Sequence, residues 1–263
     1  MRTDFNSIAV VQEEGIVQLV LDRPQARNAF SHEMMAELDA ALDAAEADPQ
    51  VLAVVLRGEG KLFSAGHDLQ DQMGDRPFHM QQFPNASPSV PPQLPRAWYF
   101  RKPLIGAVHN YVGPYAFAII ACCDFNIAAA GTRFSCEVFK GSYPAMEWLP
   151  LYLQLPMRVI EKLWLMGGWM DAEQALQFQL VQRVLPEDAV VAEALRWARQ
   201  AALIPSESFA QGKDRIRRSI ELLGLNDLPA ALERRLPQGH DGKVDLAAVR
   251  AKNALFDPEV TKV

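Results

Sequence analysis

The sequence contains little cysteine. Three cysteines occur among its 263 residues, at Cys122, Cys123 and Cys136. Adjacent cysteines cannot form an ordinary disulfide, and the spacing to the third fits no zinc-site pattern. All three stand in apolar surroundings, where a thiol behaves as a small hydrophobic side chain. We therefore expect buried, unreactive thiols and neither a disulfide framework nor a metal site.

Long apolar stretches are absent as well. No run approaches the ~20 apolar residues that a membrane-spanning helix requires. The opening segment, residues 1–15, lacks the apolar core of a signal peptide. Together with the cysteine usage, these absences predict a cytoplasmic protein without a membrane partner.

Basic residues are not in excess. The formal net charge is −6 and the pI is near 5.4. Non-specific binding to nucleic acid needs clustered lysine and arginine, so we expect no nucleic-acid partner. The one basic cluster, KDRIRRSIE at residues 213–221, is expected to be the solvated face of a helix. Contact with a phosphate is the alternative for this cluster.

The residues that are present favour a layered α/β protein. Residues 8–22 contain two β-runs joined by a Glu-Gly turn. Later short apolar runs, at 51–58, 104–110 and 125–130, are typical of strands buried on both faces. Ser31 is expected to cap a helix with one apolar stripe, formed by Met34, Leu38, Ala41, Leu42 and Ala45. This alternation of strands and helices predicts α/β layering.

The second half of the chain is predicted to be mainly helical from about residue 156. We divide the chain into a core at residues 1–195, which would hold the site, and a helical region at residues 196–263. Between the predicted elements, the proline-rich residues 84–95 cannot form an ordinary helix and are expected to be a loop.

Two glycine-containing turns join a buried strand to a helix, at residues 54–70 and 104–120. Neither has the Gly-Lys-Ser/Thr ending of a phosphate loop or the glycine spacing of a dinucleotide-binding turn. Helix N-termini present backbone N–H groups and a partial positive charge, which stabilise anions and developing oxyanions. Two such helix starts favour a site for a polarised carbonyl group.

Several segments resemble the crotonase superfamily, the enoyl-CoA hydratase/isomerase family. They are, in chain order, LDRPQARNAFSHEMMAELDAALDAAEADPQVLAVVLRGEGKLFSAGHDL, KPLIGAVHNYVGP, CDFNIAAAGTRFS, EVFKG and LMGGWMDAEQALQFQLVQRVLPED. The resemblance implies an α/β spiral of ββα units with a C-terminal helical trimerisation region, assembled as a homotrimer or hexamer. It also implies an acyl-CoA substrate and no cofactor beyond the coenzyme A of that thioester.

The resemblance implies an oxyanion hole made of two backbone N–H groups, those of His67 and Tyr115. Tyr115 stands where the family has a glycine, and Ala118 stands where the family has its first catalytic glutamate. The helix start is therefore kept while its carboxylate is lost. The imidazole of His67 is expected to line the pocket, with a role as a base as the alternative.

Glu137 matches the family's second catalytic glutamate and is the expected general acid/base. A single carboxylate can move a proton between two carbons, whereas the family's usual hydration employs two. The loss at position 118 therefore favours isomerisation of an enoyl-CoA over standard hydration. Glu147 stands where the family has a glycine and is either a replacement carboxylate or a structural residue.

Coenzyme A recognition is expected at two segments that the resemblance brings into the site. The candidate residues are Arg27, Ala29, Phe30, Lys61, Ala65, Asp68 and Leu69. Arg27 and Lys61 are candidates for the phosphates, and Asp68 is also expected to cap the helix that follows it. Two rival interpretations stay open: a non-catalytic acyl-CoA binder, and an enzyme of thioester hydrolysis or C–C cleavage.

Overall fold

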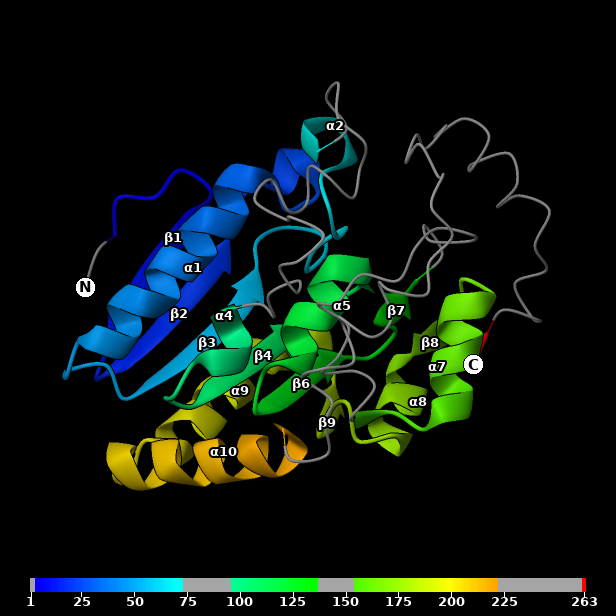
Figure 1. The fold of residues 1–263 in the computed structure, drawn as a ribbon. Coiled ribbons are helices and arrows are strands. Elements are labelled where there is room, and N and C mark those ends of the chain that lie inside the picture. Colours follow the sequence, from blue (N-terminus) through cyan, green and yellow to red (C-terminus); the bar gives the residue numbers. More distant parts are fainter. Residues whose placement is uncertain (1–2, 73–95, 137–153, 222–261) are drawn as a thin grey trace, which may run out of the picture.

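The computed structural model describes residues 3–72, 96–136, 154–221 and 262–263 (Figure 1). Glu137, Glu147 and the proline-rich segment 84–95 lie outside the described residues. The larger sheet has the strand order β1-β2-β3-β4-β6-β9. These strands are β1 (Ile8–Glu13), β2 (Ile16–Leu21), β3 (Ala53–Gly58), β4 (Leu104–Val108), β6 (Phe125–Ala129) and β9 (Arg183–Leu185). Only β1 and β2 pair antiparallel; every other neighbouring pair described in this sheet is parallel.

The β1–β2 hairpin turns at the predicted Glu-Gly pair. Glu14 and Gly15 both have positive φ, 48° and 80°, and Glu13 lies opposite Ile16. A two-residue hairpin turn needs such left-handed backbone because its twist then matches that of the strands. A Cβ atom on Gly15 would also lie 2.9 Å from Cδ1 of Leu52. The hairpin prediction is confirmed.

Helix α1 (His32–Ala47) covers the sheet at β1 and β2 (Figure 1). Its cap is Ser31, whose hydroxyl accepts a hydrogen bond from the Met34 N–H at 3.1 Å. The buried residues of the helix are the predicted stripe, Met34, Leu38, Ala41, Leu42 and Ala45. Both the cap and the stripe are confirmed.

The central strands are buried on both faces, as their apolar runs predicted. On β3, Val54 and Leu56 join the core beneath α1, whereas Ala53 and Val55 join a second core on the other face. That second core is closed by α9 (Glu187–Ala201). The predicted division at residue 195 falls within α9, which packs on the sheet along its length.

A smaller sheet follows the order β5-β7-β8, with β5 (Tyr111–Val112), β7 (Arg133–Ser135) and β8 (Trp169–Asp171). Helix α5 (Pro114–Ala121) leaves directly from β5 and packs against β7. The helices that follow are α7 (Met157–Leu165) and α8 (Ala172–Gln177). Helix α8 begins with a capping box formed by Asp171 and Gln174.

Helix α10 (Ser206–Glu221) follows α9 in the chain and carries the basic cluster (Figure 1). The prediction of a purely solvated face was wrong for Lys213, which is 6% exposed. Its ammonium contacts Oδ2 of Asp124 at 2.8 Å and the carbonyl of Lys102 at 3.1 Å. A buried charge needs such partners, so this lysine joins α10 to the β4–β6 region. Arg215 and Arg218 are exposed, as expected.

The three cysteines are free thiols in the interior, as predicted. Burial raises the pKa of the Cys122 thiol to about 12 and that of Cys123 well above its ordinary value. Since the thiolate is the reactive form, both groups are inert. In the described ranges there is no His/Cys/Asp/Glu group suited to a metal ion, and no helix long and apolar enough to cross a membrane.

Candidate active site

The site forms where the turn after β3 lies between two other segments of backbone. On one side, the Ser64 N–H donates to the Tyr111 carbonyl at 3.2 Å, ahead of α5. On the other, the Ala65 N–H donates to the Arg27 carbonyl at 2.9 Å. The middle segment is thus held from both sides by main-chain hydrogen bonds.

Two glycines allow this turn to lie directly on the start of α5. At Gly113, an added Cβ would lie 2.1 Å from the carbonyl oxygen of Ala65. At Gly66, whose φ is +90°, it would lie 3.0 Å from both N and Cδ of Pro114. No side chain fits in either contact, so the two strand-to-helix junctions meet backbone against backbone.

The backbone pattern around His67 determines where its N–H points. Phe30 and His67 form a parallel bridge, in which the Phe30 N–H donates to Gly66 at 2.8 Å and the Asp68 N–H donates to Phe30 at 2.9 Å. Hydrogen-bonding directions alternate along extended backbone, so the N–H of His67 points away from Phe30. That is the side on which the start of α5 lies.

Tyr115 occupies the first turn of α5. Gly113 is the N-cap and Pro114 the first helical residue, and the first hydrogen bond of the helix runs from Phe117 N–H to the Gly113 carbonyl at 2.8 Å. Helical geometry provides no acceptor for N–H groups before that point, and the positive end of the helix dipole lies there. Pro114 fits this place because its missing N–H removes no helical bond.

The side chains of both donor positions lie together in the structure. The rings of His67 and Tyr115 are 4.5 Å apart between centroids and inclined by 35°. Phe30 meets the Tyr115 ring edge-on at 5.0 Å. His67 and Tyr115 are each 8% exposed. The Tyr115 ring is therefore packed into the protein between two other rings.

Ala118 is completely buried one turn further along α5. The helix contains no acidic residue at all. A carboxylate that serves this site must therefore come from another segment. β7 is the neighbouring strand, and its Phe134 lies opposite Val112 of β5 in parallel register.

Comparisons with known proteins identify the family of the chain. The sequence pattern of the enoyl-CoA hydratase/isomerase family matches residues 11–236. The chain belongs to this family. It is 34% identical over 263 residues to a probable enoyl-CoA hydratase of Rhizobium meliloti, covering 92% of this chain and 95% of the relative.

Solved structures of the family have the same fold. An enoyl-CoA hydratase/isomerase from Xanthobacter autotrophicus superposes with a TM-score of 0.76 at 27% identity, over 96% of this chain and 99% of the other. One from Pseudoalteromonas atlantica gives 0.74 at 27% identity, over 94% and 98%. These matches confirm the predicted crotonase-like α/β fold and an enoyl-CoA hydratase/isomerase-like enzyme, with the exact reaction left open.

Within this enoyl-CoA hydratase/isomerase fold, the two predicted coenzyme A segments lie side by side. Ala29 and Phe30 are buried, Ala65 is half-buried, and Arg27 and Lys61 are exposed to solvent. Lys61 is adjacent to the site through its carbonyl, which accepts a hydrogen bond from Nδ2 of Asn110 at 2.8 Å. The predicted phosphate partners therefore have side chains that can reach a ligand in solvent.

Asp68 anchors the end of this segment. Its Oδ1 accepts a hydrogen bond from the Asp71 N–H at 3.3 Å, the contact expected of a cap for α2 (Leu69–Gln72), which Leu69 opens. Its Oδ2 pairs with Nη1 of Arg23 at 3.1 Å. The carboxylate is thus bound to the protein on both oxygens.

Asn28 organises the site and was missed in the sequence analysis. It is fully buried with a φ of 49°. Its Nδ2 contacts the carbonyls of Glu59, Leu62 and Phe63 at 2.8, 3.0 and 3.2 Å. The main-chain carbonyl of Asn28 accepts a hydrogen bond from the Ser64 hydroxyl at 2.6 Å. The available signal was the residue type, because asparagine tolerates left-handed backbone and can serve several main-chain groups.

Proposed function

We propose that the chain binds an acyl-CoA thioester and stabilises its enolate between the backbone N–H groups of His67 and Tyr115. The observation that carries this proposal is the direct contact of the two strand-to-helix junctions at Gly66 and Gly113. This contact supports the proposal because it joins the two segments that carry these N–H groups, beside the positive end of a buried helix. Donors of this kind typically contribute about 3–4 kcal/mol each to an oxyanion-like transition state.

In this proposal Glu137 moves the proton. β5 and β7 are parallel with Val112 opposite Phe134, so the chain leaves both strands at the same edge of the sheet. On β5 the exit leads into the helix start at Tyr115, and on β7, which ends at Ser135, Glu137 is the second residue after the strand.

Among the carboxylates that are nearer to the donors in sequence, Asp68 pairs with Arg23 and Asp124 pairs with Lys213. We therefore assign the role to a carboxylate from the β7 exit. It would take a proton from one carbon of the enoyl chain and return it to another.

The proposed reaction is a single-base proton transfer, isomerisation of an enoyl-CoA, with hydration as the other reaction of this family. Ala118 favours isomerisation because standard hydration employs a second carboxylate to hold and deprotonate water. Glu147 or the His67 imidazole would have to fill that role if water is added. We keep two further parts of the proposal: the homotrimer or hexamer, supported by the family resemblance, and the cytoplasmic location, supported by the cysteine usage.

A non-catalytic acyl-CoA binder is the second candidate. The replacement of the family glutamate by the buried Ala118 is the observation that favours it. Both candidates share the coenzyme A segments, so binding alone does not separate them.

Turnover of a panel of 2-enoyl- and 3-enoyl-CoA esters tests the proposal. We expect activity in the wild type and a fall in kcat of about 10²–10⁴-fold in Glu137→Gln, because the proton carrier is removed. Glu173→Gln, an exposed glutamate on α8, is the matched control and should retain full activity. A thioester that binds without any turnover would overturn the enzyme assignment. Activity lost in Glu147→Gln but kept in Glu137→Gln would instead move the acid/base role to Glu147.

A further inference from the structure

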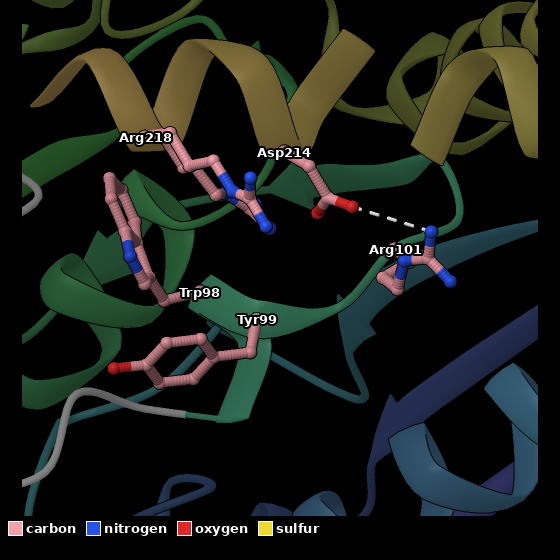
Figure 2. Close-up of a pocket in the computed structure, with 6 residues that line it drawn as sticks. Trp98, Tyr99, Arg101, Asp214 and Arg218 are labelled. Atoms are coloured by element: carbon pink, nitrogen blue, oxygen red, sulfur yellow. Dashed lines mark ion pairs between the residues drawn. The ribbon is translucent and has the colours of Figure 1, made fainter. Parts of the chain in front are cut away.

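A cavity of about 320 Å³ opens between α4 (Arg96–Tyr99) and α10 (Figure 2). It lies at the opposite end of β4 from the candidate active site. Arg101 precedes the strand, whereas the helix start at Pro114 follows its other end. Five residues of strand span about 16 Å, so the cavity and the oxyanion donors are separate places in the molecule.

Cationic side chains dominate the lining of this cavity, which is formed by Trp98, Tyr99, Arg101, Asp214, Arg217 and Arg218. The charge of Arg101 is balanced, since its Nη2 lies 3.3 Å from Asp214 and 3.7 Å from Glu207. Figure 2 shows Asp214 pointing to Arg101 and away from the middle of the cavity. The other two guanidinium groups of the lining belong to Arg217 and Arg218.

Arg217 is the inner of these two groups. Its Nη1 donates to the carbonyl of Phe100 at 3.2 Å, and its guanidinium lies 5.1 Å above the Trp98 ring. No carboxylate of the described residues lies within ion-pair distance of it. Burial lowers its pKa from the ordinary value, which is the sign of a cation that has lost water. A guanidinium has five N–H donors, and an anion in the cavity would use the ones that Phe100 does not.

Arg218 is the outer group and extends from α10 toward the segment of Trp98 and Tyr99 (Figure 2). It forms no ion pair within the described part of the chain. The Tyr99 ring is 52% exposed at the same opening. The two guanidinium groups form no ion pair among the described residues and together carry a charge of about +2; Asp124, Asp214 and Glu46 act on Arg217 only at longer range. A phosphate monoester at neutral pH matches this charge better than a carboxylate does.

We propose that this cavity binds the phosphate group of a small phosphorylated molecule, with Arg217 and Arg218 on the phosphate and Tyr99 against the organic part. The cavity is at the small end of ligand sites, which span about 300–1,000 Å³, so the ligand is a small molecule rather than a polymer. Coenzyme A also carries phosphates, at the far end of its pantetheine arm from the thioester, so the two phosphate sources share one chemistry and the titration below distinguishes them.

Calorimetric titration of the full chain with inorganic phosphate and with adenosine monophosphate at low salt tests this site. We expect both probes to bind, and Arg218→Gln to weaken binding by about tenfold, the effect of losing one charged hydrogen-bonding group. Arg215→Gln is the matched control, an exposed arginine on the same helix outside the cavity, and should change the affinity less than twofold. Arg217→Met tests the inner group, with circular dichroism to establish that it folds.

Failure of either probe to bind, or an equal loss in Arg215→Gln, would overturn the proposal, the latter by showing general attraction to a basic surface. Repeating the titration with saturating coenzyme A separates the two phosphate sources. Unchanged binding of adenosine monophosphate supports a separate site, and its loss would assign the phosphate to coenzyme A. Turnover of enoyl-CoA esters by Arg218→Gln in the absence of added phosphate should equal that of the wild type.

Discussion

The two ends of β4 have polar groups of different kinds. At one end, the candidate active site is made of backbone N–H and carbonyl groups, two glycines and three aromatic rings. At the other end, charged side chains meet, among them the largely buried pair Lys213–Asp124 and the more exposed pair Arg96–Asp43. The first end depends on close approach of the main chain, and the second on matching of charges. Substitutions should therefore damage the two ends by different physical routes.

The backbone end should be the more sensitive to a single methyl group. We expect Gly113→Ala to lower turnover of an enoyl-CoA ester by at least about 100-fold, because its Cβ would overlap the Ala65 carbonyl and separate the two donors. Steady-state kinetics measures this loss. The matched control is Gly212→Ala on α10, where an added Cβ meets nothing within 4 Å. That variant should gain about 0.5–1 kcal/mol of stability and keep its activity, because alanine favours a helix interior. Normal turnover in Gly113→Ala would show that close approach is not required.

The charged end should respond through stability. We expect Lys213→Met to lower the free energy of unfolding by about 3 kcal/mol, because the largely buried carboxylate of Asp124 would lose its cation. Urea denaturation measures this change, with Arg215→Gln as the exposed control on the same helix. A loss below about 0.5 kcal/mol would mean that the ion pair only offsets its own desolvation. The distinction between the two ends would then be weaker.

A smaller effect is expected at Asp39 on α1, near the Arg96 pair. Desolvation first, and then the charge of Asp43, raise its pKa to about 6, against the attraction of Arg96. The folded state therefore binds more protons than the unfolded state between about pH 4 and 6, and stability falls as the pH rises through that window.

Asp39→Asn should remove this pH dependence and stabilise the protein at pH 7. The gain should stay below about 1 kcal/mol, because the side chain is partly open to water and solvent screens its interactions. Thermal unfolding at pH 4 and pH 7 measures both effects. A variant whose stability keeps the wild-type slope would assign the titration to another group.

The sequence predicted the fold where the decisive signals are local. The β1–β2 turn, the Ser31 cap and the stripe of α1 each depend on residues a few positions apart, and all are confirmed. The burial of Lys213 was not predictable in this way, because its partner Asp124 is 89 residues away in the chain. Helical periodicity places a lysine on a face but does not say what another segment offers to it.

The candidate site also has features that were predictable from nearby residues and features that were not. Its helix starts were visible as glycine turns after apolar runs, and the resemblance named His67 and Tyr115 as the donor positions. The three-ring cluster with Phe30, and the role of Asn28, arise from contacts between segments that only the folded chain brings together. Whether Glu137 or Glu147 carries the proton stays a prediction for the kinetic test.

The contact between Gly66 and Gly113 has a consequence for how such a pocket can diverge. The donors proposed at positions 67 and 115 are main-chain groups, so every codon except a proline codon at those positions preserves them. The side chains at these two positions can therefore change in size and shape while the main-chain N–H groups keep their places. The positions that restrict substitution are instead the two glycines, because a larger residue at either would separate the two segments.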